Sequence, residues 1–130
     1  MVCLDTDIFV SLLRGDKEAI EFVSKLEKAN QPIRTTIITA YELLKGAGAS
    51  SMPERNLARV RDLISSARVL GLSYGACEEA SRVYAGMKRK GKTMSEFDLL
   101  IAAIAMYNDD ILISRDEHFK LVEGLTLRTW

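Results

Sequence analysis

Short apolar runs alternate along this chain with longer stretches of helical periodicity. The short runs predict strands at Met1–Asp5, Ile33–Thr36, Arg68–Leu72, Ile111–Ser114 and Leu125–Arg128. Between them, apolar residues recur every three or four positions, which is typical of helices with one buried face. Strands separated by helices pair in parallel through right-handed crossovers. The pattern therefore predicts an α/β fold, a three-layer α/β/α sandwich with a central parallel sheet.

Capping residues mark where several of the predicted helices begin. Asp16, Ser73 and Ser95 are each expected to accept hydrogen bonds from the unpaired N–H groups of a first helical turn. Ser51 and Glu54 have the spacing of a capping box, which also starts a helix. Two further helices are predicted over Asp7–Leu13 and Ile37–Ala47.

Two of the helices carry their apolar residues in different ways. The helix that follows Ser73 and ends at Gly91 has a predicted apolar stripe of Cys77, Ala80, Tyr84 and Met87. The helix that follows Ser95 is apolar on every side over Leu99–Met106. A helix of the second kind is buried on all sides, so it is expected to lie in the core.

Composition narrows the class of protein. The chain has 130 residues, 48% of them hydrophobic and 28% charged, which excludes a disordered chain and fits a single domain over residues 1–130. Cys3 and Cys77 lie far apart and His118 is the only histidine, which argues against a disulfide framework or a zinc site and favours the cytoplasm. Met1–Leu4 runs directly into Asp5, so neither a signal peptide nor a membrane span is expected.

Four carboxylates follow predicted strands or begin the helices after them, at Asp5, Glu42, Asp98 and Asp116. In an open α/β sheet, functional groups gather outside the carboxyl ends of the strands, so the topology directs all four to one edge. Each also has a structural interpretation taken singly. Asp5 could be a turn residue, Glu42 an exposed helix residue, Asp98 a charge at a helix N-terminus, and Asp116 a cap.

The surroundings of Asp98 favour a functional interpretation. Its neighbours Phe97, Leu99 and Leu100 are apolar, and no Lys or Arg of the same helix lies near it, so the carboxylate is expected to be desolvated and unpaired. Carboxylates that converge raise one another's pKa, and a divalent cation relieves that repulsion. An all-oxygen site without His or Cys suits Mg²⁺ or Mn²⁺.

The residues around these carboxylates resemble the four acidic motifs of the PIN-domain nucleases, and the compact chain is most similar to their VapC-type toxins. The matching segments are Leu4–Asp7, Tyr41–Leu44, Phe97–Ala103 and Leu112–Phe119. The resemblance implies a PIN-like fold and a metal-dependent endoribonuclease that hydrolyses RNA phosphodiester bonds.

By the same resemblance, Asp5, Glu42, Asp98 and Asp116 would hold Mg²⁺ or Mn²⁺, with the hydroxyls of Thr6 and Ser114 near the metal or its waters. It further implies the toxin of a toxin–antitoxin pair, a homodimer silenced by a small cognate antitoxin. The family often has Asn where Asp7 stands, and an acidic residue where His118 stands. Asp7 is therefore open to two interpretations, added site charge or a helix cap, and His118 to an outer role.

Other functions remain open from the sequence. Asp5 and Asp7 have the spacing of the nucleophile and the acid/base of HAD-type phosphatases, although Glu42 and Asp98 then have no role. A receiver-like signalling module would need an acidic residue where Ser73 follows the third strand. A PIN nuclease of RNA processing that is not a toxin, or a domain that only binds RNA, are further alternatives.

The charges balance at 18 basic and 18 acidic residues, which argues against a protein that coats nucleic acid by bulk attraction. One basic cluster, Lys88, Arg89, Lys90 and Lys92, leads towards Asp98 and is a candidate for binding RNA phosphates. The same cations would also suit the C-terminal end of a helix. Tyr41 and Tyr84 could stack on bases, but their place on apolar stripes favours the core.

Overall fold

A parallel five-stranded sheet forms the centre of the computed structural model, which describes residues 1–130. Its strands are β1 (Val2–Leu4), β2 (Ile33–Thr36), β3 (Arg68–Leu70), β4 (Ile111–Ile113) and β5 (Leu127–Arg128). They lie in the order β3-β2-β1-β4-β5, and every neighbouring pair is parallel. The chain runs outwards from β1 through β2 to β3, then returns to the other side of β1 as β4. The sheet therefore has its topological switch point between β1 and β4.

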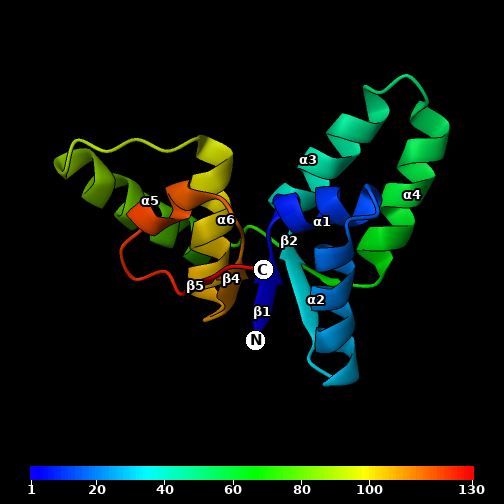
Figure 1. Ribbon diagram of the computed structural model, residues 1–130. Coiled ribbons are helices and arrows are strands. Elements are labelled where there is room, and N and C mark those ends of the chain that lie inside the picture. The colour runs from blue at the N-terminus through cyan, green and yellow to red at the C-terminus, as the bar shows by residue number, and fades with distance from the viewer.

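Helices cover both faces of this sheet (Figure 1). They are α1 (Thr6–Leu13), α2 (Lys17–Lys28), α3 (Ile37–Gly48), α4 (Pro53–Ser65), α5 (Tyr74–Arg89) and α6 (Glu96–Tyr107), with a 3₁₀ helix η1 (Glu117–Leu121). Alternate strand residues point to opposite faces, so Cys3 packs with α5 and α6 whereas Val2 and Leu4 pack with α1, α2, α3 and α4. These two hydrophobic cores confirm the predicted three-layer sandwich.

Most of the predicted helix starts are confirmed. The side chain of Asp16 accepts from two N–H groups of α2, Ser73 caps α5, and Ser95 accepts from the backbone N of Asp98 at the start of α6. The body of α6 is buried on nearly all sides, as the apolar segment Leu99–Met106 predicts. None of the helices has the length and hydropathy needed to cross a membrane.

The predicted capping box of Ser51 and Glu54 is wrong. Helix α4 begins at Pro53, a residue that suits a first turn because it lacks an N–H group. Its N-cap is therefore Met52, one residue later than the box requires, and Met52 makes no side-chain capping bond.

The predicted stripe of α5 is wrong at two positions. Cys77 and Tyr84 are exposed, and the buried residues are Ala76, Ala80, Val83 and Met87. Helix α5 packs mainly on α6, and Cys77 and Tyr84 lie outside the buried face of α5. The sequence also favours the core for Tyr41 on α3, and this prediction is wrong because 51% of the Tyr41 surface is exposed.

Candidate functional site

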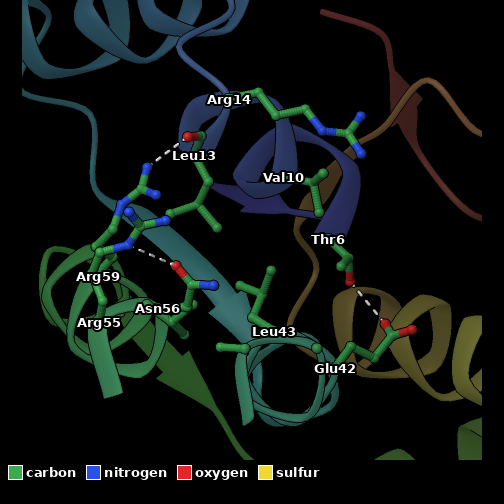
Figure 2. A pocket seen from close by; sticks show the side chains of 12 residues that line it. Thr6, Val10, Leu13, Arg14, Glu42, Leu43, Arg55, Asn56 and Arg59 are labelled. Atoms are coloured by element: carbon green, nitrogen blue, oxygen red, sulfur yellow. Dashed lines mark hydrogen bonds between the residues drawn. The ribbon is translucent and has the colours of Figure 1, made fainter. Parts of the chain in front are cut away.

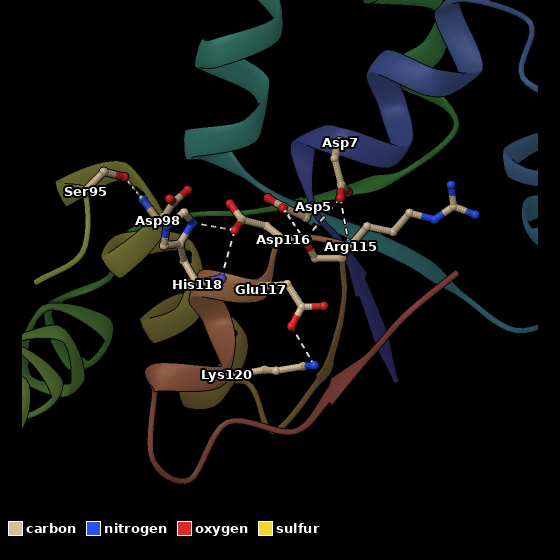
Figure 3. Close-up of polar contacts among 10 residues, drawn as sticks. Asp5, Asp7, Ser95, Asp98, Arg115, Asp116, Glu117, His118 and Lys120 are labelled. Atoms are coloured by element: carbon tan, nitrogen blue, oxygen red, sulfur yellow. Dashed lines mark hydrogen bonds and ion pairs between the residues drawn. The ribbon is translucent and has the colours of Figure 1, made fainter. Parts of the chain in front are cut away.

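Two chain segments leave the sheet side by side at the switch point. Strands β1 and β4 are paired with Leu4 opposite Ile113, and the backbone N of Asp5 donates to the carbonyl of Ile113 at 3.0 Å. Asp5 follows β1 directly and is the N-cap residue of α1. Ser114 and Asp116 follow β4. Residues more than a hundred positions apart therefore meet at one edge of the sheet (Figure 3).

Asp5 is the most deeply buried of the candidate carboxylates, with 4% of its surface exposed. Ser114, itself buried, donates its hydroxyl to Asp5 Oδ2 at 2.7 Å. Burial raises the pKa of Asp5 to about 7, the Ser114 hydrogen bond opposes that rise, and the charges of Asp7 and Asp98 add to it. No Lys, Arg or His pairs with this carboxylate. A charged Asp5 is therefore costly unless a cation joins it.

Asp7 holds α1 against the loop that follows β4. Its Oδ2 accepts from the backbone N of Arg115 at 2.7 Å and lies 3.3 Å from the Ser114 hydroxyl, while its Oδ1 accepts from Trp130 Nε1 at 3.4 Å. The ring of Trp130 also stacks against the Arg115 guanidinium at 3.5 Å. Of the two interpretations from sequence, the helix cap is wrong because Asp5 is the N-cap of α1. Asp7 instead adds negative charge near Asp5 and ties two segments together.

Asp116 is the N-cap of η1 and is bonded to His118. Its Oδ1 accepts from the backbone N of His118 at 2.9 Å, and the Nδ1 atom of the same residue lies 2.7 Å away. The hydrogen bonds to this carboxylate all go to Oδ1. The capping interpretation is thus correct, and it leaves Oδ2 without a partner from the protein.

Asp98 lies in the first turn of α6 and is only half-buried. Its pKa is raised, by burial first and further by the charge of Asp116, while the Ser95 hydrogen bond lowers it. The side chain makes no ion pair, as expected from its neighbours, but the expectation that it is the desolvated carboxylate is only partly met. Asp5 is the desolvated carboxylate because it lies at the buried switch point, whereas the first turn of α6 meets solvent.

Glu42 lies one turn into α3 and is held by Thr6. The hydroxyl of Thr6 donates to Glu42 Oε1 at 2.8 Å and lies 3.2 Å from the hydroxyl of the buried Thr39. The two residues form one edge of a pocket of about 480 Å³ between α1, α3 and α4. Arg55 and Arg59 of α4 lie across the pocket from them, and Arg14 lines it at the end of α1 (Figure 2). The hydrogen bond from Thr6 therefore holds the Glu42 side chain of α3 beside the start of α1.

The predicted carboxylates gather at one edge of the sheet but do not form a closed cage. The charge of Asp98 raises the pKa of Asp5, the charge of Asp116 raises the pKa of Asp98, and Glu42 is linked to this group through Thr6. No three acidic, His or Cys side chains are close enough together to enclose a metal ion. The donor set is carboxylate and hydroxyl oxygen, which is the chemistry that Mg²⁺ and Mn²⁺ prefer.

The predicted basic cluster is divided between two surfaces. Lys88 and Lys92 line a pocket of about 250 Å³ together with Tyr84, close to the start of α6. Arg89 and Lys90 line a different pocket, and Lys90 forms an ion pair with Glu123 at 2.7 Å. Lys90 is therefore partly neutralised, and Lys88 and Lys92 are the better placed members.

One cation beside the carboxylates was missed by sequence reasoning. The ammonium group of Lys45 lies 5.5 Å from the ring centre of Tyr41 and 5.3 Å from that of Phe97. Tyr41 and Lys45 flank Glu42 on α3, and Phe97 precedes Asp98. The only signal in the sequence was the four-residue spacing of Tyr41 and Lys45 around a candidate carboxylate.

The chain is similar to known proteins over nearly its whole length. The sequence model of the PIN domain matches residues 2–125. The chain is 29% identical over 128 residues to the tRNA(fMet)-specific endonuclease VapC of Shigella flexneri, covering 98% of this chain and 96% of that protein. Ribonuclease VapC2 of Haemophilus influenzae is similar to the same extent, with 29% identity and the same coverage.

Solved structures of toxin–antitoxin complexes share the fold. The DNA-bound VapBC of Salmonella typhimurium superposes with a TM-score of 0.91 at 26% identity, covering 99% of this chain and 97% of the matched chain. VapBC2 of Rickettsia felis, bound to a promoter DNA fragment, gives a TM-score of 0.93 at 24% identity over 100% and 99% of the two chains. The strand order and helix arrangement of this chain are thus shared with chains of solved VapBC complexes.

Proposed function

This chain belongs to the PIN domain family, and from that premise we propose that it is a metal-dependent endoribonuclease, the toxin of a toxin–antitoxin pair. The observation that carries the proposal is Asp5. A carboxylate that is 4% exposed, with its pKa raised to about 7 and no cation paired to it, is an unfavourable arrangement for stability alone. Perturbed groups of this kind cluster at functional sites.

In the proposed site, Asp5, Asp98 and Asp116 hold Mg²⁺ or Mn²⁺. Asp5 supplies a fixed oxygen, because Ser114 orients it, and Asp116 offers Oδ2, which no protein group occupies. Asp98 and Glu42 are half-buried side chains on helices, and they would supply the remaining carboxylate oxygens. Such a metal lowers the pKa of a bound water and stabilises negative charge on phosphate oxygens.

The protein groups divide the remaining work. Glu42, held by Thr6, either contacts the metal or orients the attacking water for in-line displacement at the phosphodiester. Ser114 keeps Asp5 in register with Asp116, since its hydroxyl donates to Asp5 and accepts from the backbone N of Asp116 at 3.0 Å. Each carboxylate has to be ionised to act, so the site gains activity as pH rises towards and above neutrality.

The partners in this proposal come from relatives. The similar proteins are called ribonucleases or a tRNA(fMet)-specific endonuclease, and the similar structures are VapBC complexes. We therefore propose an RNA substrate, a small antitoxin partner, a homodimer and action in the cytoplasm. The antitoxin complexes favour a toxin over a PIN nuclease of RNA processing.

Asp7 argues against a phosphatase mechanism. An acid/base in that mechanism has to reach the substrate, whereas the Asp7 carboxylate accepts hydrogen bonds from Arg115 and Trp130. Replacing Asp7 by Asn keeps one acceptor oxygen, so a nuclease should retain most of its activity. A phosphatase would lose nearly all of it. Hydrolysis of a phosphomonoester and of labelled RNA, measured on this one variant, separates the two functions.

The decisive experiment is RNA cleavage with the metal and one carboxylate varied. Structured and single-stranded RNA are incubated with the wild-type chain in Mn²⁺ or in EDTA, and with Asp98→Asn in Mn²⁺. Of these three conditions, cleavage is expected only for the wild-type chain in Mn²⁺, and the control variant below should cleave as the wild-type chain does. Asp109→Asn at the other end of α6 is the matched control, because Asp109 is exposed and its φ of 56° suits Asn. Cleavage that persists in EDTA, or equally in Asp98→Asn, contradicts the proposed chemistry.

A further inference from the structure

An aromatic pair with one cation lies across the two helices that carry Glu42 and Asp98. The rings of Tyr41 and Phe97 meet edge to face, 5.6 Å between centres and 85° between planes. The Lys45 ammonium lies over both rings, at 5.5 Å and 5.3 Å. We call Tyr41, Lys45 and Phe97 the aromatic clamp. It joins α3 to α6 at the edge of the sheet where the carboxylates gather.

The aromatic residues of the clamp each directly precede a candidate carboxylate in the sequence. Tyr41 is followed by Glu42 on α3. Lys45 lies four residues after Tyr41 and three after Glu42 on α3, so it is a neighbour of both on the helix surface. Phe97 immediately precedes Asp98 on α6. A nucleotide whose phosphate reached the carboxylates would therefore meet the clamp next.

The charge of Lys45 is not used by the protein. The chain offers Glu42 and Asp98 nearby, yet Lys45 forms an ion pair with neither and no acidic side chain lies within 4 Å of it. Its contacts with the two rings orient the ammonium without neutralising it, because ring faces attract a cation but carry no net charge. An oriented cation without a counter-ion is suited to bind a phosphate.

The ring of Tyr41 is also available. Its surface is 51% exposed, and the edge-to-face contact with the half-buried Phe97 fixes the orientation of the ring. An exposed, fixed aromatic ring beside a cation is the usual arrangement for binding single-stranded nucleic acid, since every base has a face that can stack. Paired bases keep their faces inside the duplex, so only unpaired RNA can use such a ring.

We propose that the aromatic clamp is a nucleotide subsite for unpaired RNA, in which Tyr41 stacks on a base and Lys45 binds the adjoining backbone phosphate. Phe97 is the positioning residue that fixes the Tyr41 ring. The inference rests on the proposed ribonuclease function, and it specifies that function further by naming an unpaired nucleotide at the cleavage point.

Binding of fluorescein-labelled RNA tests the subsite in EDTA, where metal-dependent cleavage does not occur. Tyr41→Leu is expected to weaken binding of a single-stranded oligonucleotide about tenfold, whereas Tyr41→Phe keeps the ring and the affinity. Lys45→Gln is expected to weaken binding and to reduce the slope of log K against log salt by about 0.7, the value for one phosphate contact on a single strand. Duplex RNA of the same sequence should bind all four proteins alike.

Matched controls are available elsewhere on the surface. Tyr74→Leu removes a tyrosine that is 79% exposed, and Lys28→Gln removes an exposed lysine at the far end of α2. Both are expected to bind RNA as the wild-type chain does. Molar mass from light scattering is measured for every variant.

Several outcomes overturn the subsite. The first is that single-stranded RNA does not bind the wild-type chain, and the second is that Tyr41→Leu binds it as well as the wild-type chain does. The third is that Tyr41→Phe and Tyr41→Leu lose the same affinity. The fourth is a changed molar mass in Tyr41→Leu, which would make this surface an interface between copies of the chain. If the wild-type chain cleaves RNA in Mn²⁺ while the clamp variants bind normally, the subsite is wrong and the proposed function stands. If the variants lose binding but no cleavage occurs, the subsite stands and the nuclease is wrong.

Discussion

Two buried carboxylates lie at opposite ends of the central sheet, and they are treated differently. Asp110, just before β4, forms an ion pair with Arg34 of β2, which donates to both of its carboxylate oxygens. Asp5, just after β1, has the same 4% exposure but no cationic partner, and its one side-chain donor is the Ser114 hydroxyl. The sheet therefore contains a neutralised carboxylate at its amino edge and an unneutralised one at its carboxyl edge.

The difference separates a structural role from a functional one. Burying a charge is costly, and a protein usually offsets the cost with a partner, as Arg34 does for Asp110. At Asp5 the cost remains, and it raises the pKa of the carboxyl to about 7. In the proposed nuclease a metal ion would be the missing partner of Asp5, and a cation site is then expected at this end of the sheet only.

Asp5→Asn is expected to have the largest effect on activity, a loss of roughly a thousandfold or more in Mn²⁺-dependent RNA cleavage, comparable to removal of a transition-state stabilising group. The same variant should be more stable than the wild-type chain in EDTA above pH 7, because the amide removes a buried charge. Cleavage assays and thermal unfolding check the two effects. Cleavage within tenfold of the wild-type rate, or a lower unfolding temperature at pH 8, contradicts the functional role of Asp5.

Asp110→Asn is the reciprocal variant and should affect stability alone. Its removal leaves the half-buried Arg34 guanidinium without its counter-ion, which is expected to cost up to about 3 kcal/mol in the free energy of unfolding. Because the pair lies at the opposite end of the strands from Asp5, cleavage at a temperature where the variant is folded should be unchanged. Urea unfolding measures the loss of stability, and the rate of RNA cleavage at about 20 °C measures the activity. A variant that is as stable as the wild-type chain but has lost activity would contradict the proposed difference between Asp110 and Asp5.

Stability and metal binding should depend on pH in opposite directions. Folding raises the pKa of Asp5 from 3.8 to about 7, so the metal-free protein is most stable below pH 3.8 as far as this group is concerned, and that contribution is lost as pH rises through 7. Mn²⁺ requires the ionised carboxylate, whose fraction rises about fiftyfold from pH 5 to pH 7 with this pKa, so the affinity for Mn²⁺ should rise by the same factor. Calorimetric titration with Mn²⁺ measures this rise, and a flat profile, or one unchanged in Asp5→Asn, would refute it.

Local sequence signals predicted the fold well where neighbouring residues decide the structure. Ile33–Thr36 forms a strand with the predicted bounds, and the uniformly apolar segment after Ser95 forms the buried helix α6. The position of a stripe was harder to predict, because periodicity does not say which helix covers it. Tyr41 and Tyr84 lie on stripes whose edges no other element covers, so both are half-exposed.

The site followed from topology more than from motifs. Asp5 and Asp116 lie together because β1 and β4 are neighbours in the sheet. The alternation of strands and helices predicts that both residues lie at the same edge of the sheet, but it does not predict which strands are neighbours. Degrees of burial were not predictable, since Asp5 has polar sequence neighbours in Thr6 and Asp7 yet lies at the switch point. The hydrogen bond from Ser114, 109 positions away, is a tertiary contact that no local spacing encodes.

Ser114→Ala makes the smallest change to the contrast, because it removes the donor to Asp5 and keeps the carboxylate. The lost hydrogen bond opposed the effect of burial, so the pKa of Asp5 should rise above 7, and cleavage at pH 7 should fall about tenfold and recover as pH is raised. Ser65→Ala is the control, since Ser65 is an exposed residue that bonds only to the carbonyl of Asp62. A uniform loss of cleavage at every pH would mean that Ser114 acts on the substrate and not through Asp5. The shift of the pH profile therefore measures how much the Ser114 hydroxyl alone stabilises the ionised form of Asp5, where Asp110 has the guanidinium of Arg34.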